Sequence, residues 1–590
     1  MTDQTPFYVT TPIYYVNDRP HIGHCYTTLV ADVAARFERL RRGSGRDVFF
    51  LTGTDEHAEK VVETAQKRGL SPMEWATQNA GEFRKAFDFM GFSFDDFVRT
   101  TEDRHKARAS DYIERLMKSG DIELGDYEGW WDASQEEYLT ETVAKDANFV
   151  SPVSGKPLER RKEQNYFFRL DKYEAQLFDA IARGERGEPG GVRILPEARR
   201  NEVLGRIRGG LQRVPVSRRI REGDADWGIR MPGDPAHRVY VWIEALCNYL
   251  TVVDNERAPS TAAAEGGSRR RFWPASVHLM AKDILWFHAV IWPAMLMALG
   301  EEPPRTVYAH AYWVREGRKM SKSLGNFIEI ETIEAYAKRY SLDAVRWYLL
   351  TQGPLGATDA DFSHAKFVEV YNADLANGIG NCASRVGNMI EKYFGGKVPE
   401  PRDYQQGFYQ RLLPDGSFDT STVLGQALAA RQVAGTPVPT GQSVKAFNFP
   451  DVVKHHVAEA LAALDALDLV RAVQMGIQLV RFVDDFISHT APFTLAKQIN
   501  EDESKKSALQ TILWACAETV RIASVMVSPV MPSKARHIWD AWNCFPPEGA
   551  EFRHLCEFGG EYKLNPGQAI SKGEALFMRA DPAEAAPVAG

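Results

Sequence analysis

The chain has 590 residues, of which 44% are apolar and 25% charged, a composition that excludes a disordered protein. A chain of this length holds roughly three to five domains. Its formal net charge of −8 excludes a simple basic coat protein of nucleic acid, but not an enzyme with local basic patches.

The cysteines and the apolar segments indicate where the protein works. The six cysteines are scattered without a C-x-x-C pair, so their spacing predicts no thiolate zinc site. Sparse cysteines indicate a reducing compartment, and we expect a cytoplasmic protein without a membrane partner. The first 20 residues carry acid and proline, so we expect that they do not form a signal peptide. The apolar stretch 284–300 contains His288 and Pro293 and predicts a buried helix.

The first 55 residues have the pattern of a parallel β-α-β unit with a right-handed crossover. The segment 7–16 is β-rich, apolar residues recur at helical spacing from Tyr26 to Leu40, and 47–57 is a second buried strand. Arginines in the last helical turn and Gly43 after it predict where the helix ends.

The next part of the chain changes character. The segment 119–165 predicts short strands and turns of an insertion. The stretch 193–221 has nine arginines against two glutamates and is either a solvated face or a phosphate-binding surface. Patterns typical of a parallel sheet return at 239–246, 276–284 and 306–314.

From about residue 363 the pattern is helical, most clearly at 452–487 and 508–527. The segment 404–446 is rich in Gln, Gly, Pro, Thr and Ser and predicts a surface insertion. We expect a frayed tail at the C-terminal end.

The segment His21-Ile22-Gly23-His24 opens the first predicted helix. A helix N-terminus offers N–H groups and partial positive charge to a phosphate. Gly23 lets a flat ligand approach the backbone, and the two histidines lie on one face of the first turn, where they can donate to phosphate oxygens. A capped helix with incidental histidines is the alternative for this segment alone.

A second segment, Lys319-Met320-Ser321-Lys322-Ser323, follows the 306–314 strand. Its cations and small hydroxyl donors suit a triphosphate that loses pyrophosphate, although an exposed basic loop has the same composition. The two segments in this order, one on each half of a parallel sheet, are the pair seen in class I aminoacyl-tRNA synthetases.

The chain resembles the methionyl-tRNA synthetase family over most of its length. The segments that carry the resemblance are 11–37, 51–60, 127–141, 164–170, 227–250, 281–296, 317–326 and 374–390. The resemblance implies an α/β fold: a Rossmann-like parallel-sheet catalytic domain, split by a connective insertion and followed by an all-α anticodon-binding helical bundle. It divides the chain into a first catalytic half (1–118), a connective insertion without zinc (119–225), a second catalytic half (226–313), a stem-contact region with the KMSKS loop (314–362), a helical anticodon-binding domain (363–535, with the surface insertion 404–446) and a C-terminal extension (536–590).

The resemblance implies a pocket for the methionine side chain, a thioether that packs well against aromatic rings. The matching positions are Ile13, Tyr15, Trp242, Ala245, Leu246, Tyr249, His288 and Trp292. Asp55 matches the carboxylate that holds the substrate ammonium group, and it follows a strand of the expected parallel sheet, where ligands bind. Arg218 matches an arginine near the active site.

The implied reaction joins methionine to tRNA(Met), including the initiator, by way of a methionyl-adenylate formed from Mg-ATP. The ATP-binding positions are His21, Gly23, His24, Asp283, Lys319, Met320, Ser321, Lys322 and Ser323, with Asp283 on the ribose and Lys282 as a further candidate for phosphate. Catalysis is positioning and charge stabilisation by His21, His24, Lys319 and Lys322, without a covalent enzyme intermediate.

The resemblance assigns anticodon reading to Asn381 and Arg385, four residues apart on one helix. Phe493 stands where the family usually has tryptophan; it can stack on a base, but more weakly than an indole. A core aromatic at a helix end is the alternative for Phe493.

The sequence departs from the family at the zinc ligands. Many relatives hold zinc on two C-x-x-C knuckles, and the matching positions here are Asp132, Gln135, Ser151 and Ser154, so we expect no metal. Glu244 replaces the usual aspartate. We expect the chain to lack the C-terminal dimerising module of some relatives and therefore to be a monomer.

Three alternatives remain. Another class I synthetase would be specific for leucine, isoleucine, valine or cysteine; the first three usually have a longer insertion, and the last needs zinc thiolates. A non-catalytic relative would have lost the histidines or lysines, and a small ligase such as pantothenate synthetase would not need 363–530.

Overall fold

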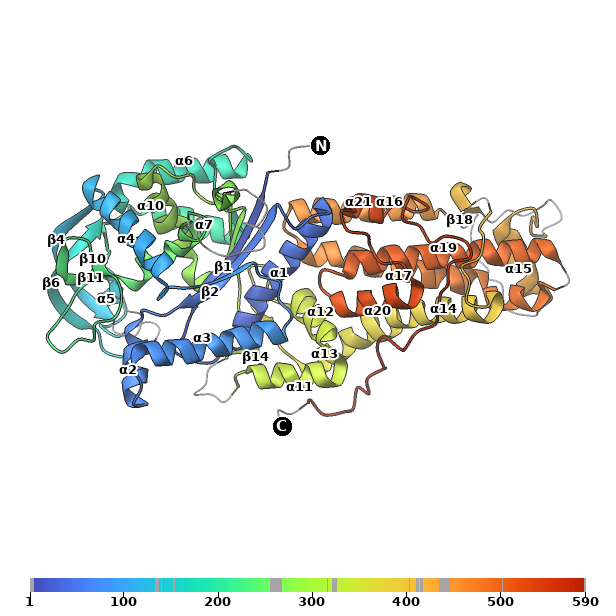
Figure 1. The fold of residues 1–590 in the computed structure, drawn as a ribbon, viewed down its shortest axis with the longest axis horizontal. Coiled ribbons are helices and arrows are strands. Elements are labelled where there is room, and N and C mark those ends of the chain that lie inside the picture. The colour runs from blue at the N-terminus through green and yellow to red at the C-terminus, as the bar shows by residue number, and fades with distance from the viewer. Residues whose placement is uncertain are drawn as a thin grey trace. The chain divides into compact units, whose positions relative to one another are not determined.

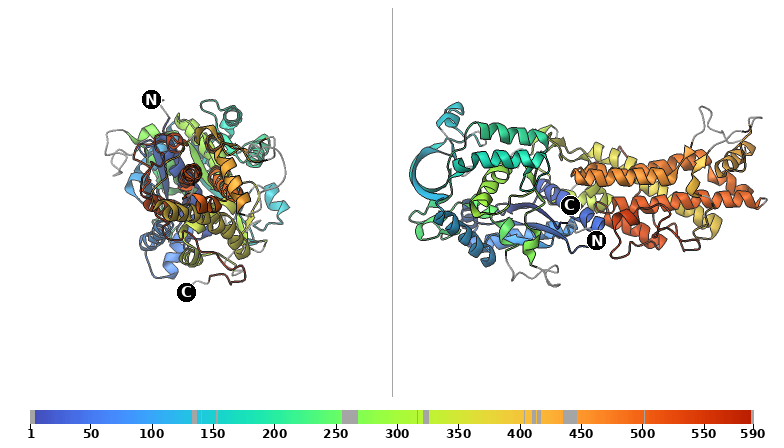
Figure 2. Two further views of the ribbon diagram at one scale, coloured as in Figure 1. Left: turned by 90° about the vertical axis from the view of Figure 1, so that its right-hand side faces the viewer. Right: turned by 90° about the horizontal axis from the view of Figure 1, so that it is seen from above.

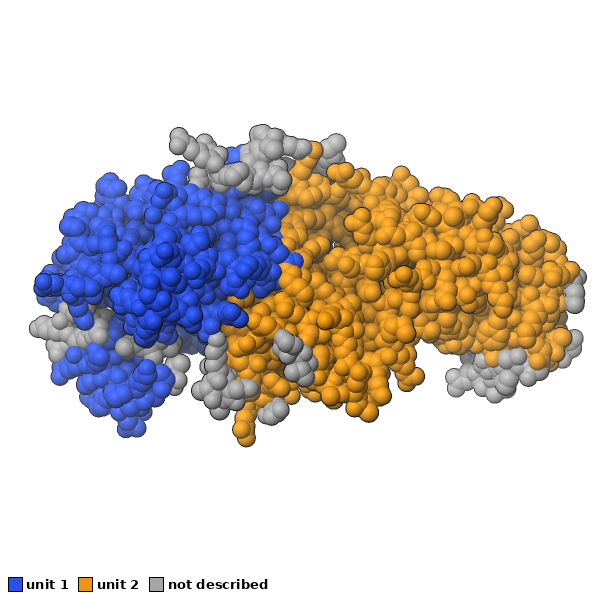
Figure 3. Space-filling view, turned by 60° about the horizontal axis from the view of Figure 1, so that its bottom comes forward, with its two compact units in different colours: residues 1–19, 49–88, 94–311 blue, residues 20–48, 89–93, 312–590 orange. Residues whose placement is uncertain are grey.

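The computed structural model describes two compact units, which Figure 3 colours separately. Unit 1 is formed by 1–19, 49–88 and 94–311, and unit 2 by 20–48, 89–93 and 312–590. The described residues are 5–132, 137–139, 141–151, 154–254, 268–315, 317–320, 326–402, 404–409, 413, 417–434, 446–500 and 502–587. In this described part of the chain, no helix is both long and apolar enough to cross a membrane.

A six-stranded sheet with the order β3-β2-β1-β12-β13-β7 forms the centre of unit 1 (Figure 1). Its strands are β1 (Phe7–Tyr15), β2 (Val48–Asp55), β3 (Asp96–Arg99), β7 (Arg193–Leu195), β12 (Val277–Ala281) and β13 (Thr306–His310). The β2–β3, β1–β12, β12–β13 and β13–β7 pairings are parallel. Every residue of β2 is buried, as expected for a parallel strand covered on both faces. The predicted α/β class with a parallel sheet is confirmed.

Helices accompany this sheet in unit 1. They are α2 (Glu59–Lys67), α3 (Pro72–Phe89), α4 (Asp103–Lys118), α6 (Glu174–Glu185), α7 (Glu197–Arg208), α8 (Val241–Leu246), α9 (Asn248–Thr251) and α10 (Trp292–Leu299), the last preceded by a π-helical segment, Phe287–Ile291. The buried helix predicted within 284–300 is therefore confirmed.

Two of the strand predictions need correction. The strand predicted at 239–246 is wrong, because β11 (Asp234–Val239) ends there and α8 follows. A short apolar run has no period that distinguishes a buried helix from a buried strand. The pattern at 306–314 contains two strands: β13 joins the central sheet, whereas β14 (Trp313–Arg315) belongs to another sheet.

The segment expected to form the insertion contains longer strands than predicted. A four-stranded sheet has the order β5-β4-β6-β8, built from β4 (Ile122–Asp132), β5 (Glu137–Leu139), β6 (Glu159–Phe168) and β8 (Val214–Pro215), with α5 (Glu141–Asp146) beside β4. A small sheet joins β9 (Ser217–Arg219), β11 and β10 (Arg230–Met231). Within the same segment, β7 returns to the central sheet, so 119–225 is not wholly separate from it.

Ion pairs and ring contacts occupy much of the arginine-rich stretch 193–221. Arg199 pairs with Glu202 at 2.8 Å, and the guanidinium of Arg206 lies 3.9 Å from the ring centre of Trp286. Arg213 pairs with Glu123. These contacts favour the solvated, structural interpretation over the phosphate-binding one.

Unit 2 is mainly helical, and the long helices α16, α17 and α19 pack alongside one another (Figures 1 and 2). Its helices are α1 (Ile22–Arg42), α11 (Ile330–Tyr340), α12 (Leu342–Gln352), α13 (His364–Val370), a π-helical segment (Tyr371–Gly380), α14 (Asn381–Phe394), α15 (Val423–Val433), α16 (Phe449–Asp465), α17 (Leu469–Thr490), α18 (Pro492–Leu495), α19 (Glu503–Val527), α20 (Pro532–Trp542) and α21 (Phe552–Leu555). Its short strands are β14, β15 (Arg318–Lys319), β16 (Ala360–Asp361), β17 (Phe408–Tyr409) and β18 (Ala446–Phe447). The predicted helical character of the C-terminal part is confirmed, apart from the short antiparallel pair of β17 and β18.

The segment 404–446 contributes to the core of unit 2, although its composition predicts a surface insertion. Its helix α15 packs against α18 and α19, and Leu424, Ala427 and Leu428 are fully buried. The C-terminal end is also packed: the backbone oxygen of Met578 accepts from the hydroxyl of Tyr371, and Asn372 forms two hydrogen bonds with the backbone of Ala580. The described part of the tail, up to residue 587, is therefore not frayed.

Helix α1 belongs to unit 2, where it contacts α12, α17 and α21. It ends as predicted at Gly43, whose φ is +65°, a value that glycine adopts without strain. A Cβ atom at this position would lie 2.4 Å from the backbone oxygen of Gly549, so the close packing against that turn also requires glycine.

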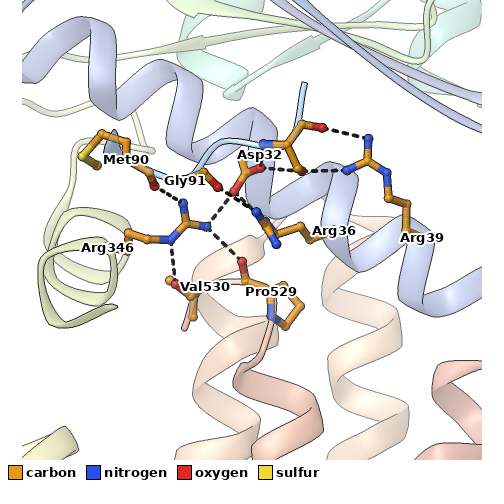
Figure 4. Close-up of polar contacts among 9 residues, drawn as sticks. Asp32, Arg36, Arg39, Met90, Gly91, Arg346, Pro529 and Val530 are labelled. Atoms are coloured by element: carbon orange, nitrogen blue, oxygen red, sulfur yellow. Dashed lines mark hydrogen bonds and ion pairs between the residues drawn. The ribbon is translucent and has the colours of Figure 1, made fainter. Parts of the chain in front are cut away.

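A buried ion pair joins α1 to the rest of unit 2 (Figure 4). The side chains of Asp32 on α1 and Arg346 on α12 are both fully buried, and their charged atoms lie 2.6 Å apart. Arg346 also donates to the backbone oxygens of Met90, Pro529 and Val530 at 3.0, 3.2 and 2.9 Å. One guanidinium thus holds together four segments that are distant in the sequence.

Candidate active site

The carboxyl ends of β1 and β12 define the candidate site of unit 1. The two strands are parallel neighbours, yet their sequence positions are far apart, so the strand order reverses between them. Ligands of such sheets bind outside the carboxyl ends at this switch point. Asp55 ends the next strand, and its backbone oxygen accepts from the N–H of Val16 at 3.3 Å. Asp283 is exposed, directly beyond β12.

Tyr249, His288 and Trp292 form the buried part of the predicted methionine site. The hydroxyl of Tyr249 lies 2.8 Å from Nε2 of His288, and its ring centre is 6.2 Å from that of Trp292. Because Nδ1 of His288 lies 2.9 Å from the backbone oxygen of Ile284, which can only accept, Nε2 is the acceptor and the phenol donates. Burial lowers the pKa of His288 to about 4, so its imidazole is neutral at neutral pH.

A second aromatic group lies nearer the surface. Tyr15, at the end of β1, meets Trp242 edge to face with ring centres 5.6 Å apart, and Trp242 stacks on Phe287 at 4.3 Å. Ile13 is partly buried against the same hydrophobic core. Ala245 and Leu246 on α8 are buried. The structure therefore places all the predicted methionine positions in unit 1. Their aromatic and imidazole rings belong to the two groups just described.

The sequence marks Glu244 only as a substitution, but the structure shows it at the centre of a buried network. One carboxylate oxygen lies 2.6 Å from Nδ1 of His57, and the other lies 3.0 Å from Nε2 of His105. Burial acts to raise the pKa of Glu244, but the two imidazoles outweigh it and hold the pKa below its usual range. This network ties α8, which carries Trp242 and Ala245, to the loop after β2 and to α4.

The two motif histidines cap helix α1 in unit 2. Nδ1 of His21 accepts from the N–H of Gly23 at 3.0 Å, and Nδ1 of His24 accepts from the N–H of His21 at 3.2 Å. Both Nδ1 atoms are acceptors, so each neutral ring carries its proton on Nε2. Burial, together with the neighbouring His21, lowers the pKa of His24 well below its ordinary value. These rings are therefore arranged to act as neutral hydrogen-bond donors.

Local packing explains the glycine of this motif and its relation to the second motif. A Cβ atom on Gly23 would lie 2.9 Å from the His21 ring, so a side chain would displace the capping imidazole. The ring centre of His21 is 4.6 Å from that of Phe327, and the N–H of Ile22 donates to the backbone oxygen of Ile328 at 3.1 Å. The start of α1 thus contacts the residues that follow the second motif.

The second motif is described only in part. Lys319 pairs through its backbone with Val314 in a β-hairpin, and Met320 is partly buried. Ser321, Lys322 and Ser323 lie outside the described residues.

The predicted anticodon residues lie on the helices of unit 2. Arg385, one turn after Asn381 on α14, pairs with Asp484 of α17 at 3.2 Å. After α17, Ala491 adopts a left-handed conformation and Pro492 starts α18, which leaves 45% of Phe493 exposed. That exposure is greater than a core aromatic would have.

The structure places Asp132 and Ser151 among the buried residues, whereas Ser154 is exposed and Gln135 lies outside the described residues. The described residues contain no group of three or more His, Cys, Asp or Glu side chains that could hold a metal ion.

Arg218, predicted to lie near the active site, has its guanidinium between two aromatic rings, 4.6 Å from the ring centre of Trp131 and 4.1 Å from that of Tyr240.

We expect the buried histidines of unit 1 to make the protein less stable in acid. Burial lowers the pKa values of His288 and His310 to about 4, whereas the unfolded chain has ordinary values near 6.5. The unfolded chain therefore binds more protons, and stability is lost as the pH falls below 6.5. From pH 7 to pH 5 each histidine should lower the free energy of unfolding by about 2 kcal/mol.

Urea denaturation at both pH values measures this loss. The variant His310→Gln removes one of the two histidines. It should therefore lose about half as much free energy of unfolding between pH 7 and pH 5 through these groups as the wild type does. Equal denaturation midpoints at pH 7 and pH 5 would contradict the expected neutral state of these imidazoles.

Comparison with known proteins decides the family. A family model described as "tRNA synthetases class I (M)" matches residues 7–147 and 145–387. The methionine--tRNA ligase of Caldanaerobacter subterraneus subsp. tengcongensis is 36% identical over 575 residues, which cover 98% of this chain and 79% of that protein. This chain belongs to the class I methionyl-tRNA synthetase family.

Other members of the methionyl-tRNA synthetase family show the same extent of similarity. The methionine--tRNA ligase of Mesorhizobium japonicum is 37% identical, with 97% of each chain covered. The structure of Mycobacterium tuberculosis methionyl-tRNA synthetase in complex with methionyl-adenylate has a TM-score of 0.79 at 32% identity and covers 97% of this chain and all of that one. The predicted family and fold class are therefore confirmed, and the synthetases for leucine, isoleucine, valine and cysteine are excluded as the family of this chain.

Proposed function

We propose that this chain is an ATP-dependent methionine–tRNA ligase. A carboxylate oxygen of L-methionine attacks the α-phosphorus of Mg-ATP, and pyrophosphate leaves. The 2′-hydroxyl of the terminal tRNA adenosine then attacks the carbonyl carbon of the adenylate, and AMP leaves. The observation that carries this proposal is the group formed by Asp55 and the aromatic side chains at the carboxyl ends of the central strands.

In this proposal, each part of methionine has its own partner. The Asp55 carboxylate holds the ammonium group, and the thioether packs against Tyr249, His288 and Trp292, the remaining wall being formed by Ile13, Tyr15, Trp242, Ala245 and Leu246. The phenol of Tyr249 donates to His288, so its oxygen keeps a lone pair toward the substrate. The buried, neutral side chains suit an uncharged substrate side chain.

The phosphates of ATP would be bound by the two motifs. His21 and His24 donate from Nε2 while they remain neutral, and Gly23 keeps the approach to the backbone open. Lys319 and Lys322 stabilise the charge that develops on the leaving pyrophosphate, with Met320, Ser321 and Ser323 in the same loop. Asp283 accepts from the ribose hydroxyls, since it stands exposed beyond β12.

We further propose that unit 2 reads the anticodon of tRNA(Met), initiator included. Asn381 and Arg385 would bond to base edges, and the exposed Phe493 would stack on an unpaired base. The proposed domain boundaries, the monomeric state, the cytoplasmic location and the absence of zinc belong to the same proposal. The substitution of the four knuckle positions by Asp132, Gln135, Ser151 and Ser154 supports the last of these.

Methionine-dependent exchange of pyrophosphate into ATP, followed by charging of tRNA with a CAU anticodon, tests the proposed function. We expect both reactions with methionine and neither with leucine. Exchange with leucine but not methionine would refute the assignment, and the absence of both reactions would favour a non-catalytic relative.

Phe493→Ala should lower charging but leave pyrophosphate exchange unchanged, because exchange needs no tRNA.

A further inference from the structure

A buried histidine that the proposed reaction does not use lies directly behind the predicted methionine site. His278 on β12 is fully buried, and its ring centre lies 4.3 Å from that of Tyr249. Nε2 of His278 lies 3.2 Å from the indole nitrogen of Trp292, and Nδ1 lies 2.8 Å from the hydroxyl oxygen of Thr10 on β1. A histidine in an apolar strand gives no local sequence signal of such contacts.

The contacts determine the protonation of this imidazole. An indole nitrogen can only donate, so Nε2 of His278 must be an acceptor. The proton of the neutral ring is then on Nδ1, from which it is donated to Thr10, whose hydroxyl oxygen can accept. Burial and the neighbouring His288 lower the pKa of His278 well below its ordinary value, which agrees with a neutral ring.

The same contacts fix the orientation of Trp292. Its indole is fully buried on α10, and a buried N–H without an acceptor is costly. Among the described residues, His278 is the acceptor of this N–H. An indole that satisfies this bond keeps one orientation toward Tyr249. The hydroxyl of Thr10 accepts the Nδ1 proton of His278 and so supports the tautomer in which Nε2 is the acceptor.

We propose that His278 is a positioning residue for methionine binding, which acts by holding the Trp292 indole through a chain from Thr10 to His278 to Trp292. The proposal rests on the proposed function, because it requires that Trp292 contacts the methionine side chain. These linked hydrogen bonds set the shape of the pocket for a thioether before the substrate enters. His278 should therefore affect methionine affinity more than the rate of chemistry.

Calorimetric titration with L-methionine, together with pyrophosphate-exchange kinetics, tests this proposal. His278→Leu leaves the indole N–H without its acceptor, and we expect an increase of about tenfold in the Kd and KM for methionine. The KM for ATP and the kcat should be unchanged. His278→Gln retains an acceptor at the position of Nε2 and should stay close to the wild-type values.

Thr10→Val gives a second, nearly isosteric test for the case that His278→Leu does not fold. Loss of the Thr10 acceptor lets the imidazole proton move to Nε2, where it opposes the indole N–H, and we expect the Kd for methionine to rise about threefold. His278→Leu in a Trp292→Phe background should cause no further change, because phenylalanine has no N–H to hold.

The control is His237→Leu, which removes another buried histidine of unit 1. His237 bonds to Asp234 and to the backbone oxygen of Gln164, and methionine affinity should not change. Wild-type affinity in both His278→Leu and Thr10→Val would overturn the proposal, as would an equal loss in His237→Leu. If the wild-type chain itself does not bind methionine, the proposed function fails rather than the role of His278.

Discussion

Replacing Arg346 by methionine is expected to lower the free energy of unfolding by about 3–5 kcal/mol, the largest loss of stability that we predict. Methionine fills similar volume but has no donor. The buried Asp32 then loses one of its cationic partners, and the backbone oxygens of Met90 and Val530 lose the donor that Arg346 supplies. Burial acts to raise the pKa of Asp32, and the charges of Arg346 and Arg36 with the hydrogen bond from Ser93 outweigh it. Urea denaturation measures the loss.

Arg39→Met is the matched control for this experiment. Arg39 lies on α1, the helix of Asp32, but it is partly exposed, and it donates to the side-chain and backbone oxygens of Ser93 at 2.7 and 3.0 Å. We expect a loss of about 1 kcal/mol for this variant. Combining Asp32→Asn with Arg346→Met should cost less than the sum of the single changes, because no buried charge is left unpaired. Equal losses for Arg346→Met and Arg39→Met would refute the importance of the buried pair.

Replacing Lys322 by alanine is expected to lower the rate of adenylate formation by a factor of about 10²–10³. The lysine is proposed to act on charge that develops only in the transition state, so the affinity for methionine should change little. Pyrophosphate-exchange kinetics at saturating methionine measure the rate, and titration with methionine measures the affinity.

Lys338→Ala removes an exposed lysine from α11 and therefore controls for the change in net charge. We expect its exchange rate to match that of the wild type. A wild-type kcat for Lys322→Ala would remove this lysine from the mechanism. A loss that appears only in the KM for methionine would assign Lys322 to the amino-acid site instead.

The sequence predicts the elements of this fold where the local signal is long and clearly bounded. The strands β1 and β2 and the helix α1 follow from apolar periodicity and from the cap at Gly43. The strand predicted at 239–246 fails because a short, mostly apolar run carries no decisive period. The buried face of α15 is hidden by a surrounding composition typical of loops.

The candidate site is predictable only where a motif or a family pattern marks it. His21, Asp55 and Trp292 are found in this way. The partners of Glu244 and His278 are not, because Glu244 meets His105 across 139 positions and His278 meets Thr10 across 268 positions. Such pairs arise from the order of the strands, which local patterns do not encode.

The membership of α1 in unit 2 has a consequence for any attempt to shorten this protein. The apolar side chains of α1 are covered by α12, α17 and α21, all of which lie beyond residue 340. A chain cut after the central sheet would expose that surface and lose the partner of Asp32. The helix that carries the first motif is thus stabilised by the part of the chain proposed to bind the anticodon, and a minimal aminoacylation fragment must keep those helices as its scaffold.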